Sequence, residues 1–241
     1  MKNMITESNK MAESTVTCYL IQKVLLGCGI VSSLFYACMD VIGGTRWQEY
    51  SWLSQEFSQL SAIGAPSRTL HLVLNPIYTL LVIAFGLAIW WAAGQKRALR
   101  VVGCSLIVYA LVSFVWPQFF PEDLNMPVSA FTNTMHIIIT IVTVLSWMLI
   151  LGFGATAFGM RFRLYTIATL LIVIIFGVST APQAAAMIAG RSTPWLGLTE
   201  RINIYSFMLW VVVLAIALLR ATETREVFSS HVADDHPIIH A

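Results

Sequence analysis

The chain has 241 residues, of which 58% are hydrophobic and 11% are charged, and its mean hydropathy is +0.77. Soluble domains carry about a quarter charged residues, so this composition excludes an ordinary soluble domain and indicates a protein of the lipid bilayer. The formal net charge of +2 is too small and too scattered for binding nucleic acid, and we predict no such partner.

Six apolar stretches are each close to the ~20 residues that a helix needs to cross about 30 Å of hydrocarbon. They cover Val24–Ile42, Thr69–Ala93, Val101–Trp116, Met135–Phe158, Leu164–Met187 and Asn203–Leu219. Backbone groups surrounded by lipid must be hydrogen-bonded within the chain, so each stretch is predicted to be a helix. The predicted fold class is therefore all-α: an integral membrane bundle of six transmembrane helices.

The flanking segments and the basic residues predict the domains and the orientation. Residues 1–23 form a polar leader, residues 24–219 the transmembrane domain and residues 220–241 a polar tail, which we expect to be unstructured. With cytoplasmic termini, the basic residues that face outward are Arg46, Arg68, Arg191 and Arg201, out of 14 Lys and Arg in total. This matches the positive-inside distribution. We predict a multi-pass protein of the bacterial inner (plasma) membrane with both termini in the cytoplasm.

The first outer loop contains an amphipathic segment. Between Tyr50 and Ile63, apolar residues recur at three- and four-residue spacing, which predicts a short amphipathic helix. Ser51 is a suitable N-cap, and Gly64 followed by Pro66 is a suitable stop. The polar face carries hydroxyls, amides and an acid rather than Lys or Arg. This favours a lid folded over the bundle, and an inert helix on the membrane surface is the alternative.

Polar side chains recur about one helical turn apart in the outer half of every predicted span. They are Ser32, Tyr36 and Asp40; His71, Asn75 and Tyr78; Tyr109 and Ser113; His136, Thr140 and Thr143; Ser179 and Gln183; and Asn203 and Ser206. The inner halves are mostly apolar. Polar groups in a membrane normally face the protein interior or water, so we expect a cup that opens outward above an apolar floor. A channel or carrier needs polar groups along its whole path, which disfavours transport.

The residues at the mouth of this cup are the candidate site. Arginine is suited to phosphate and carboxylate, so we expect Arg68 and Arg201 to hold an anionic group. The other predicted ligand-binding residues are Asn75, Asp123, Glu200 and Ser58. A histidine can act as acid and base near neutral pH, so the candidate catalytic residues are His71, His136 and Asp40.

A structural role for the same residues is the alternative. Asp40, Glu200 and the two arginines could pair with one another and hold the loops, and the histidines could link helix ends by hydrogen bonds. The histidines lack the local spacing typical of a metal site, so we predict no metal and no cofactor.

Several short motifs carry a family resemblance. They are "SQLSAIGAP" in the first outer loop, "FPED" after the third span, the histidine opening the fourth span and "GLTERI" before the sixth. In this order they resemble the bacterial membrane family catalogued as domain of unknown function 998, over about Leu25 to Arg220. The resemblance implies a six-helix membrane protein and gives no activity. The matching positions are Ser58, Gly64, Pro66, Pro121, Asp123, His136, Gly197 and Arg201, whereas Gln59 departs from a pattern in which an acid is common.

The function that these observations favour is binding of a small anionic molecule or a lipid headgroup in the outward-facing cup. The first alternative is a membrane-embedded enzyme, hydrolase-like, with His71 or His136 as acid and base. The others are a structural or sensory partner of another membrane protein, and a transporter. The sequence predicts the lipid bilayer as surroundings and identifies no protein partner.

Overall fold

The computed structural model describes residues 2–127, 130–188 and 191–235. Their helices are α1 (Lys2–Thr45), the 3₁₀ helix η1 (Ser58–Ser61), α2 (Arg68–Ala92), α3 (Arg97–Phe119), α4 (Phe131–Gly154), α5 (Met160–Ile188) and α6 (Leu196–Asp235). Six of these are long and apolar enough to cross a membrane. Within these ranges there is no β-strand, so the predicted all-α bundle of six spans is confirmed.

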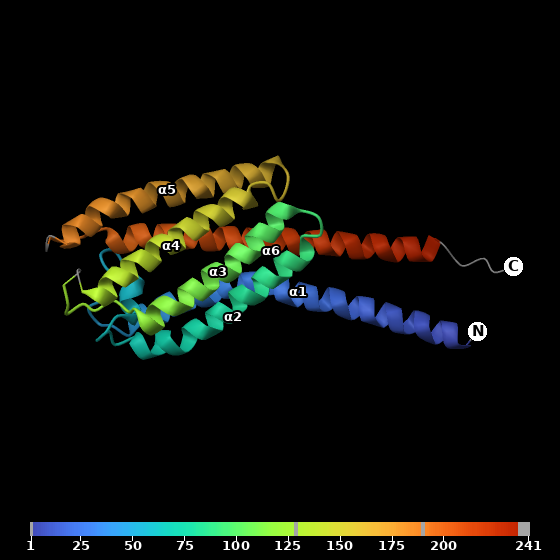
Figure 1. Ribbon diagram of the computed structural model, residues 1–241, viewed down its shortest axis with the longest axis horizontal. Coiled ribbons are helices and arrows are strands. Elements are labelled where there is room, and N and C mark those ends of the chain that lie inside the picture. The colour runs from blue at the N-terminus through green and yellow to red at the C-terminus, as the bar shows by residue number, and fades with distance from the viewer. Residues whose placement is uncertain (1, 128–129, 189–190, 236–241) are drawn as a thin grey trace.

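The first and last helices extend beyond the predicted spans. α1 begins at Lys2, and α6 continues to Asp235, so the prediction of an unstructured tail is wrong up to that residue; residues 236–241 lie outside the described part. Neither extension contains Gly or Pro, the two residues that most weaken a helix interior. Figure 1 shows both extensions leaving the same end of the bundle.

α6 also begins earlier than the predicted span, at Leu196 rather than Asn203. Glu200 and Arg201 therefore lie on the helix itself and not on a preceding loop. Hydropathy missed this first turn because its polar side chains are turned into the protein instead of towards lipid.

The helix predicted over Tyr50–Ile63 is wrong in extent, because the described segment is mostly turns and is helical only in η1. The backbone groups that a longer helix would use internally are bound elsewhere. The Leu53 carbonyl accepts a hydrogen bond from the Leu198 N–H at 3.0 Å, and the Gln55 carbonyl accepts one from Arg201 at 2.8 Å. Hydrogen bonds to residues of α6 have therefore replaced the hydrogen bonds that a helix would form within the segment. The segment 57–62 is nevertheless buried on the bundle and does not float on a membrane surface.

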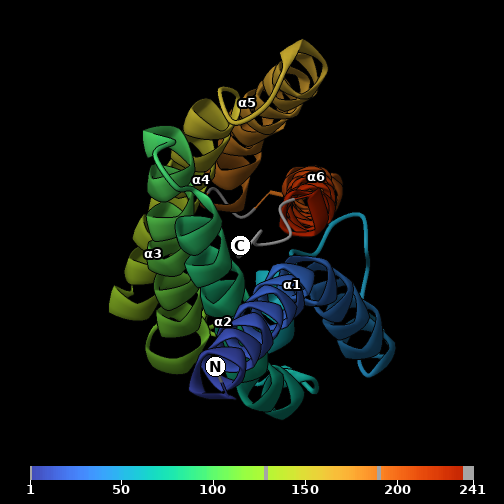
Figure 2. The ribbon, with the colours of Figure 1, turned by 90° about the vertical axis from the view of Figure 1, so that its right-hand side faces the viewer.

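The six helices form a ring. Each packs on the next in the chain, and α6 returns to α1, as the end-on view in Figure 2 shows. The core is filled by large side chains from several helices, among them Phe85, Leu106, Phe207 and Trp210. α4 and α5 are the least enclosed: only 22% and 17% of their most apolar windows are buried, against 50% for α6. These two helices therefore have the largest share of surface available to lipid.

Candidate functional site

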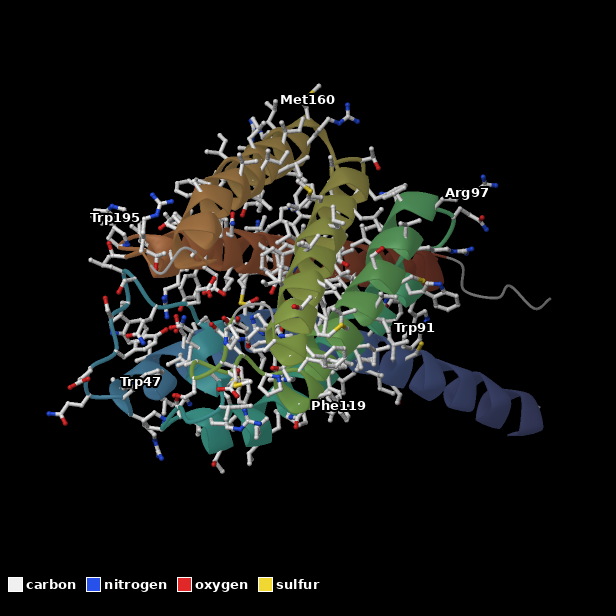
Figure 3. The ribbon with its side chains drawn as sticks, turned by 60° about the vertical axis from the view of Figure 1, so that its left-hand side comes forward. Trp47, Trp91, Arg97, Phe119, Met160 and Trp195 are labelled. Carbon is white, nitrogen blue, oxygen red and sulfur yellow. The ribbon has the colours of Figure 1, made fainter. Side chains whose placement is uncertain are left out.

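A cavity of about 1270 Å³ occupies the loop end of the bundle. All six long helices contribute to its wall, together with residues 54–59 of the first loop, 122–126 of the second and 192–194 of the third. Figure 3 shows this end of the molecule at Trp47 and Trp195, opposite the end that carries Arg97 and Trp91. Along α4 the lining runs from Asn133 to Met148, which at ~1.5 Å per residue is a depth of about 22 Å.

Most of the predicted polar stripes meet in this cavity. The stripe residues that line it are Tyr36, Asn75, Tyr78, Tyr109, Ser113, His136, Thr140, Thr143 and Asn203. They come from five different helices, so the helix rotations expected from the sequence are the ones present. Some are already hydrogen-bonded within the protein: Asn75 Nδ2 donates to the Ser113 carbonyl at 3.2 Å, and the hydroxyls of Tyr78 and Tyr109 are 2.8 Å apart.

The floor of the cavity is aromatic and packed. The ring of Trp147 stacks on Phe207 with centroids 4.8 Å apart, and the Tyr109 ring meets Phe207 edge-on at 5.6 Å. Below them Ile150 and Leu214 are completely buried. The polar cup therefore ends on an apolar layer in the middle of the bundle.

The charged side chains that line the cavity are acidic. They are Glu56, Glu122, Asp123 and Glu200, and no Lys or Arg is among the described residues of the wall. Burial raises the pKa of Glu56 well above its ordinary value, and the nearby Glu200 and Glu122 raise it further. Burial also raises the pKa of Glu122 to about 7. Neither Arg68 nor Arg201, the two residues expected to hold an anionic group, is part of this lining.

Arg201 is engaged entirely by the protein. Its Nε and Nη2 donate to the two carboxylate oxygens of Asp40 at 3.0 and 2.9 Å, and Nη2 also donates to the Tyr50 hydroxyl. Nη1 donates to the carbonyls of Trp52, Gln55 and Gly197 at 3.1, 2.8 and 3.2 Å. Arg201 is 7% exposed and Asp40 1%. All five N–H groups of the guanidinium have acceptors, so none is left for an anion. The pair instead has the loop-holding role that was the structural alternative.

The other predicted residues are divided between the cavity and its surroundings. Ser58, Asn75, Asp123, Glu200 and His136 line it, whereas Arg68, His71 and Asp40 do not. Arg68 Nη1 donates to the Ser61 carbonyl at 2.9 Å. His71 is buried edge-on against Phe57, with ring centroids 5.1 Å apart. Among the described side chains, no hydrogen bond joins either imidazole to a carboxylate.

Sequence reasoning missed several residues that shape the site. Glu56 was read only as part of a polar helix face, yet it lines the cavity. Tyr205 donates to Asp40 at 2.6 Å, and Asn133 accepts from the Asp123 N–H at 2.7 Å, which shapes the second loop. An isolated acid in a loop between apolar spans is the signal that could have drawn attention to Glu56. Nothing local distinguishes Tyr205.

The fold and the cavity define a multi-pass membrane protein whose six helices enclose a cavity with acidic side chains at one end of the bundle. The family model described as "Protein of unknown function (DUF998)" matches residues 30–217. The chain belongs to this family, which confirms the resemblance found in the motifs. No curated protein and no solved structure matches the chain significantly.

Proposed function

We propose that this protein binds an amphiphilic, lipid-like molecule, with the polar headgroup at the loop end of the cavity and the apolar chain between α4 and α5. The observation that carries the proposal is the two-part wall. Glu56, Glu122 and Glu200 line the loop end, while residues such as Val144, Met148 and Ile174 line the deeper part. A ligand with one polar and one apolar end matches such a gradient.

The position of the apolar part supports a ligand drawn from the bilayer. Ile141 and Leu145 of α4 and Val178 of α5 all line the cavity, and they are 54%, 58% and 68% exposed. They belong to α4 and α5, the two helices with the least buried apolar windows, which favours an opening of the cavity towards lipid between these helices. An acyl chain can enter there without crossing water.

The proposal includes an orientation. The turns 93–96 and 155–159 lie at the end of the bundle from which the extensions of α1 and α6 project, together with Lys96, Arg97 and Arg100. The positive-inside rule assigns this end to the cytoplasm. We infer that the cavity faces the outer leaflet of the plasma (inner) membrane. The packed floor favours binding over a path for transport.

The test is retention of a lipid by the purified protein. The protein is reconstituted in nanodiscs of equal parts phosphatidylethanolamine and phosphatidylglycerol, released, and weighed by native mass spectrometry. Gly177 lines the cavity, and a Cβ there has ordinary contact with Asn203 at 3.8 Å, so Gly177→Leu fills cavity space. Gly152, whose added Cβ meets nothing within 4 Å, gives the matched control Gly152→Leu.

We expect the wild type and Gly152→Leu to retain a bound lipid and Gly177→Leu to lose most of it. Equal retention in the two variants would place the lipid outside the cavity. Absence of a retained lipid in the wild type would rule out the proposal.

A further inference from the structure

The loop end of the cavity concentrates carboxyl groups without a counter-charge on its wall. Glu56 comes from the first loop, Glu122 from the second and Glu200 from α6, and the three interact electrostatically. Arg201 does not supply this counter-charge, because its guanidinium is hydrogen-bonded to Asp40 and to backbone carbonyls. Like charges held together away from water are costly, so an arrangement of this kind calls for a cation or for protons.

A second observation points to an absent ligand. Ser58 is 6% exposed and lines the cavity, yet its hydroxyl has no hydrogen-bond partner. Oε2 of Glu122 and Nδ1 of His136 also lack a well-formed hydrogen bond, although the Ser58 and Gln59 side chains lie close enough to the Glu122 carboxyl to favour its ionised form. Buried polar atoms are hydrogen-bonded in the great majority of cases. All three residues line the same cavity, so a polar group of a ligand there can supply the missing partners.

The geometry fits a molecular cation better than a metal ion. Among the described residues, no three His, Cys, Asp or Glu side chains are close enough together to ligate one ion. Carboxyl groups that share one end of a cavity without converging on a single point suit a charge bulkier than a metal ion. The wall also contains the aromatic rings of Tyr36 and Trp116, whose faces attract organic cations.

We infer that, within the binding function proposed above, the headgroup is an ammonium group, held by Glu56, Glu122 and Glu200 as counter-ions, with the Ser58 hydroxyl as an additional acceptor where the ammonium group carries an N–H. The site then selects amines and quaternary ammonium groups and rejects phosphate as the sole charge. The proposed ligand is therefore a cation, and not the small anionic molecule expected from the sequence.

The titration of the site supplies a signature. The raised pKa of Glu122, about 7, means that this carboxyl binds a proton in the empty site at neutral pH and below. The ionisable groups of the surrounding elements are Glu56, Asp123, His136, Glu200 and, through Asp40, Arg201. A bound cation favours the ionised carboxylate, so binding releases a proton and tightens as the pH rises.

The experiment compares ligands with one tail and different heads. The protein in dodecyl maltoside micelles is titrated calorimetrically, against a micelle blank, with dodecyltrimethylammonium, dodecyl phosphate and monolauroylglycerol. Tetramethylammonium tests the headgroup without a tail. We expect dodecyltrimethylammonium to bind about tenfold or more tighter than dodecyl phosphate, and its affinity to rise between about pH 5.5 and about pH 8, because a permanent cation does not itself titrate.

Variants distinguish binding at this site from nonspecific attraction of the cation to acidic residues. Glu122→Gln and Glu56→Gln should each weaken binding of the ammonium ligand about tenfold or more, and Glu122→Gln should flatten its pH dependence. Glu49→Gln, an exposed acid in the same outer region as Glu56, is the matched control and should change nothing. Unchanged thermal unfolding of the variants shows that they are folded. If Glu122→Gln does not fold, the loss of binding in Glu56→Gln is the test.

The outcomes distinguish the two proposals. If none of the three dodecyl ligands binds, the amphiphile-binding function itself fails. If all three bind equally, or the phosphate binds more tightly, the cavity binds amphiphiles but the ammonium assignment is overturned. If tetramethylammonium binds as tightly as dodecyltrimethylammonium, the ammonium assignment is supported. The proposal that the cavity also binds an apolar tail is then contradicted.

Discussion

Asp40 and Arg201 form a buried ion pair that joins α1, α6 and the first loop. The carboxylate also accepts from the Tyr205 hydroxyl at 2.6 Å, and the guanidinium lies 5.0 Å from the centroid of the Trp52 ring. A buried pair of this kind is not by itself a large source of stability, because both charges lose their hydration. Breaking it is costly, since the remaining charge stays buried without a partner.

Asp40→Asn should therefore destabilise the protein strongly. Removing one partner of a buried pair costs about 3–5 kcal/mol, whereas Tyr205→Phe removes one hydrogen bond worth about 0.5–1.5 kcal/mol and leaves the pair intact. Thermal unfolding in detergent, followed by intrinsic fluorescence, measures both. We expect a large fall in the midpoint for Asp40→Asn and a small one for Tyr205→Phe. Equal midpoints would contradict the role of the pair.

At this scale the sequence supplied the residue types but not their partners. Asp40 and Arg201 are separated by 161 positions, and both were placed at the outer end of their spans. Either could have faced a ligand, and the choice depended on where Tyr50, Trp52 and Gln55 lie. Their backbone and side chains fill the guanidinium's donors. Local patterns contain no information on such a long-range fit.

Among the elements, α2 and α3 make a close contact through two glycines. A Cβ added to Gly103 would lie 2.7 Å from the Gly86 carbonyl oxygen, and one added to Gly86 would lie 2.8 Å from the Gly103 carbonyl. Small residues of this kind allow helix backbones to approach in a membrane, where packing rather than the hydrophobic effect holds helices together.

Gly103→Ala is predicted to force the two helices apart and to lower the unfolding midpoint. The matched variant Gly152→Ala places the same methyl group in open space on α4, so it should leave the midpoint unchanged or raise it, because Ala is the better helix former by up to about 1 kcal/mol. Thermal unfolding of the two variants in the same detergent makes the comparison. A destabilised Gly152→Ala with an unaffected Gly103→Ala would refute the close contact.

The first loop shows where reasoning from periodicity fails for an element. The apolar spacing over Tyr50–Ile63 correctly marked residues that become buried, such as Phe57 and Leu60. It did not give the backbone conformation, because the Phe57 N–H donates to Glu200 instead of to a helix carbonyl. The six long helices were predictable because lipid leaves their backbones no alternative partner. In the loop, nearby side chains provide one.

On the scale of the whole molecule, charge and aromatic residues mark two membrane faces. Trp90 and Trp91 are exposed near the turn 93–96, and Trp195 is exposed at the opposite end, as Figure 3 shows for Trp91 and Trp195. Tryptophan is enriched at both membrane–water interfaces. With the basic turns on one side and the acidic cavity on the other, the molecule has a defined polarity across the bilayer.

This polarity predicts the labelling of single cysteines placed in a background without the four native ones. Gln48 and Gln95 are exposed at opposite ends of the bundle. A membrane-impermeant maleimide should label Gln48→Cys in intact cells and Gln95→Cys only after permeabilisation, because basic turns remain in the cytoplasm. The reverse pattern would invert the orientation and place the cavity at the inner leaflet.

The sequence by itself determined the number of spans, the family and the inward-facing polar stripes, because each depends on a local property: the length of an apolar run, a short motif or the spacing of side chains on one helix. Only the tertiary structure decided which charged side chains line the cavity. It brought Glu56, Glu122 and Glu200 to one cavity and gave Arg201 to Asp40, since these meetings depend on how six helices and three loops pack. Of the arginines and acids expected at the mouth of the cup, the structure leaves acids, and no described arginine, on the cavity wall.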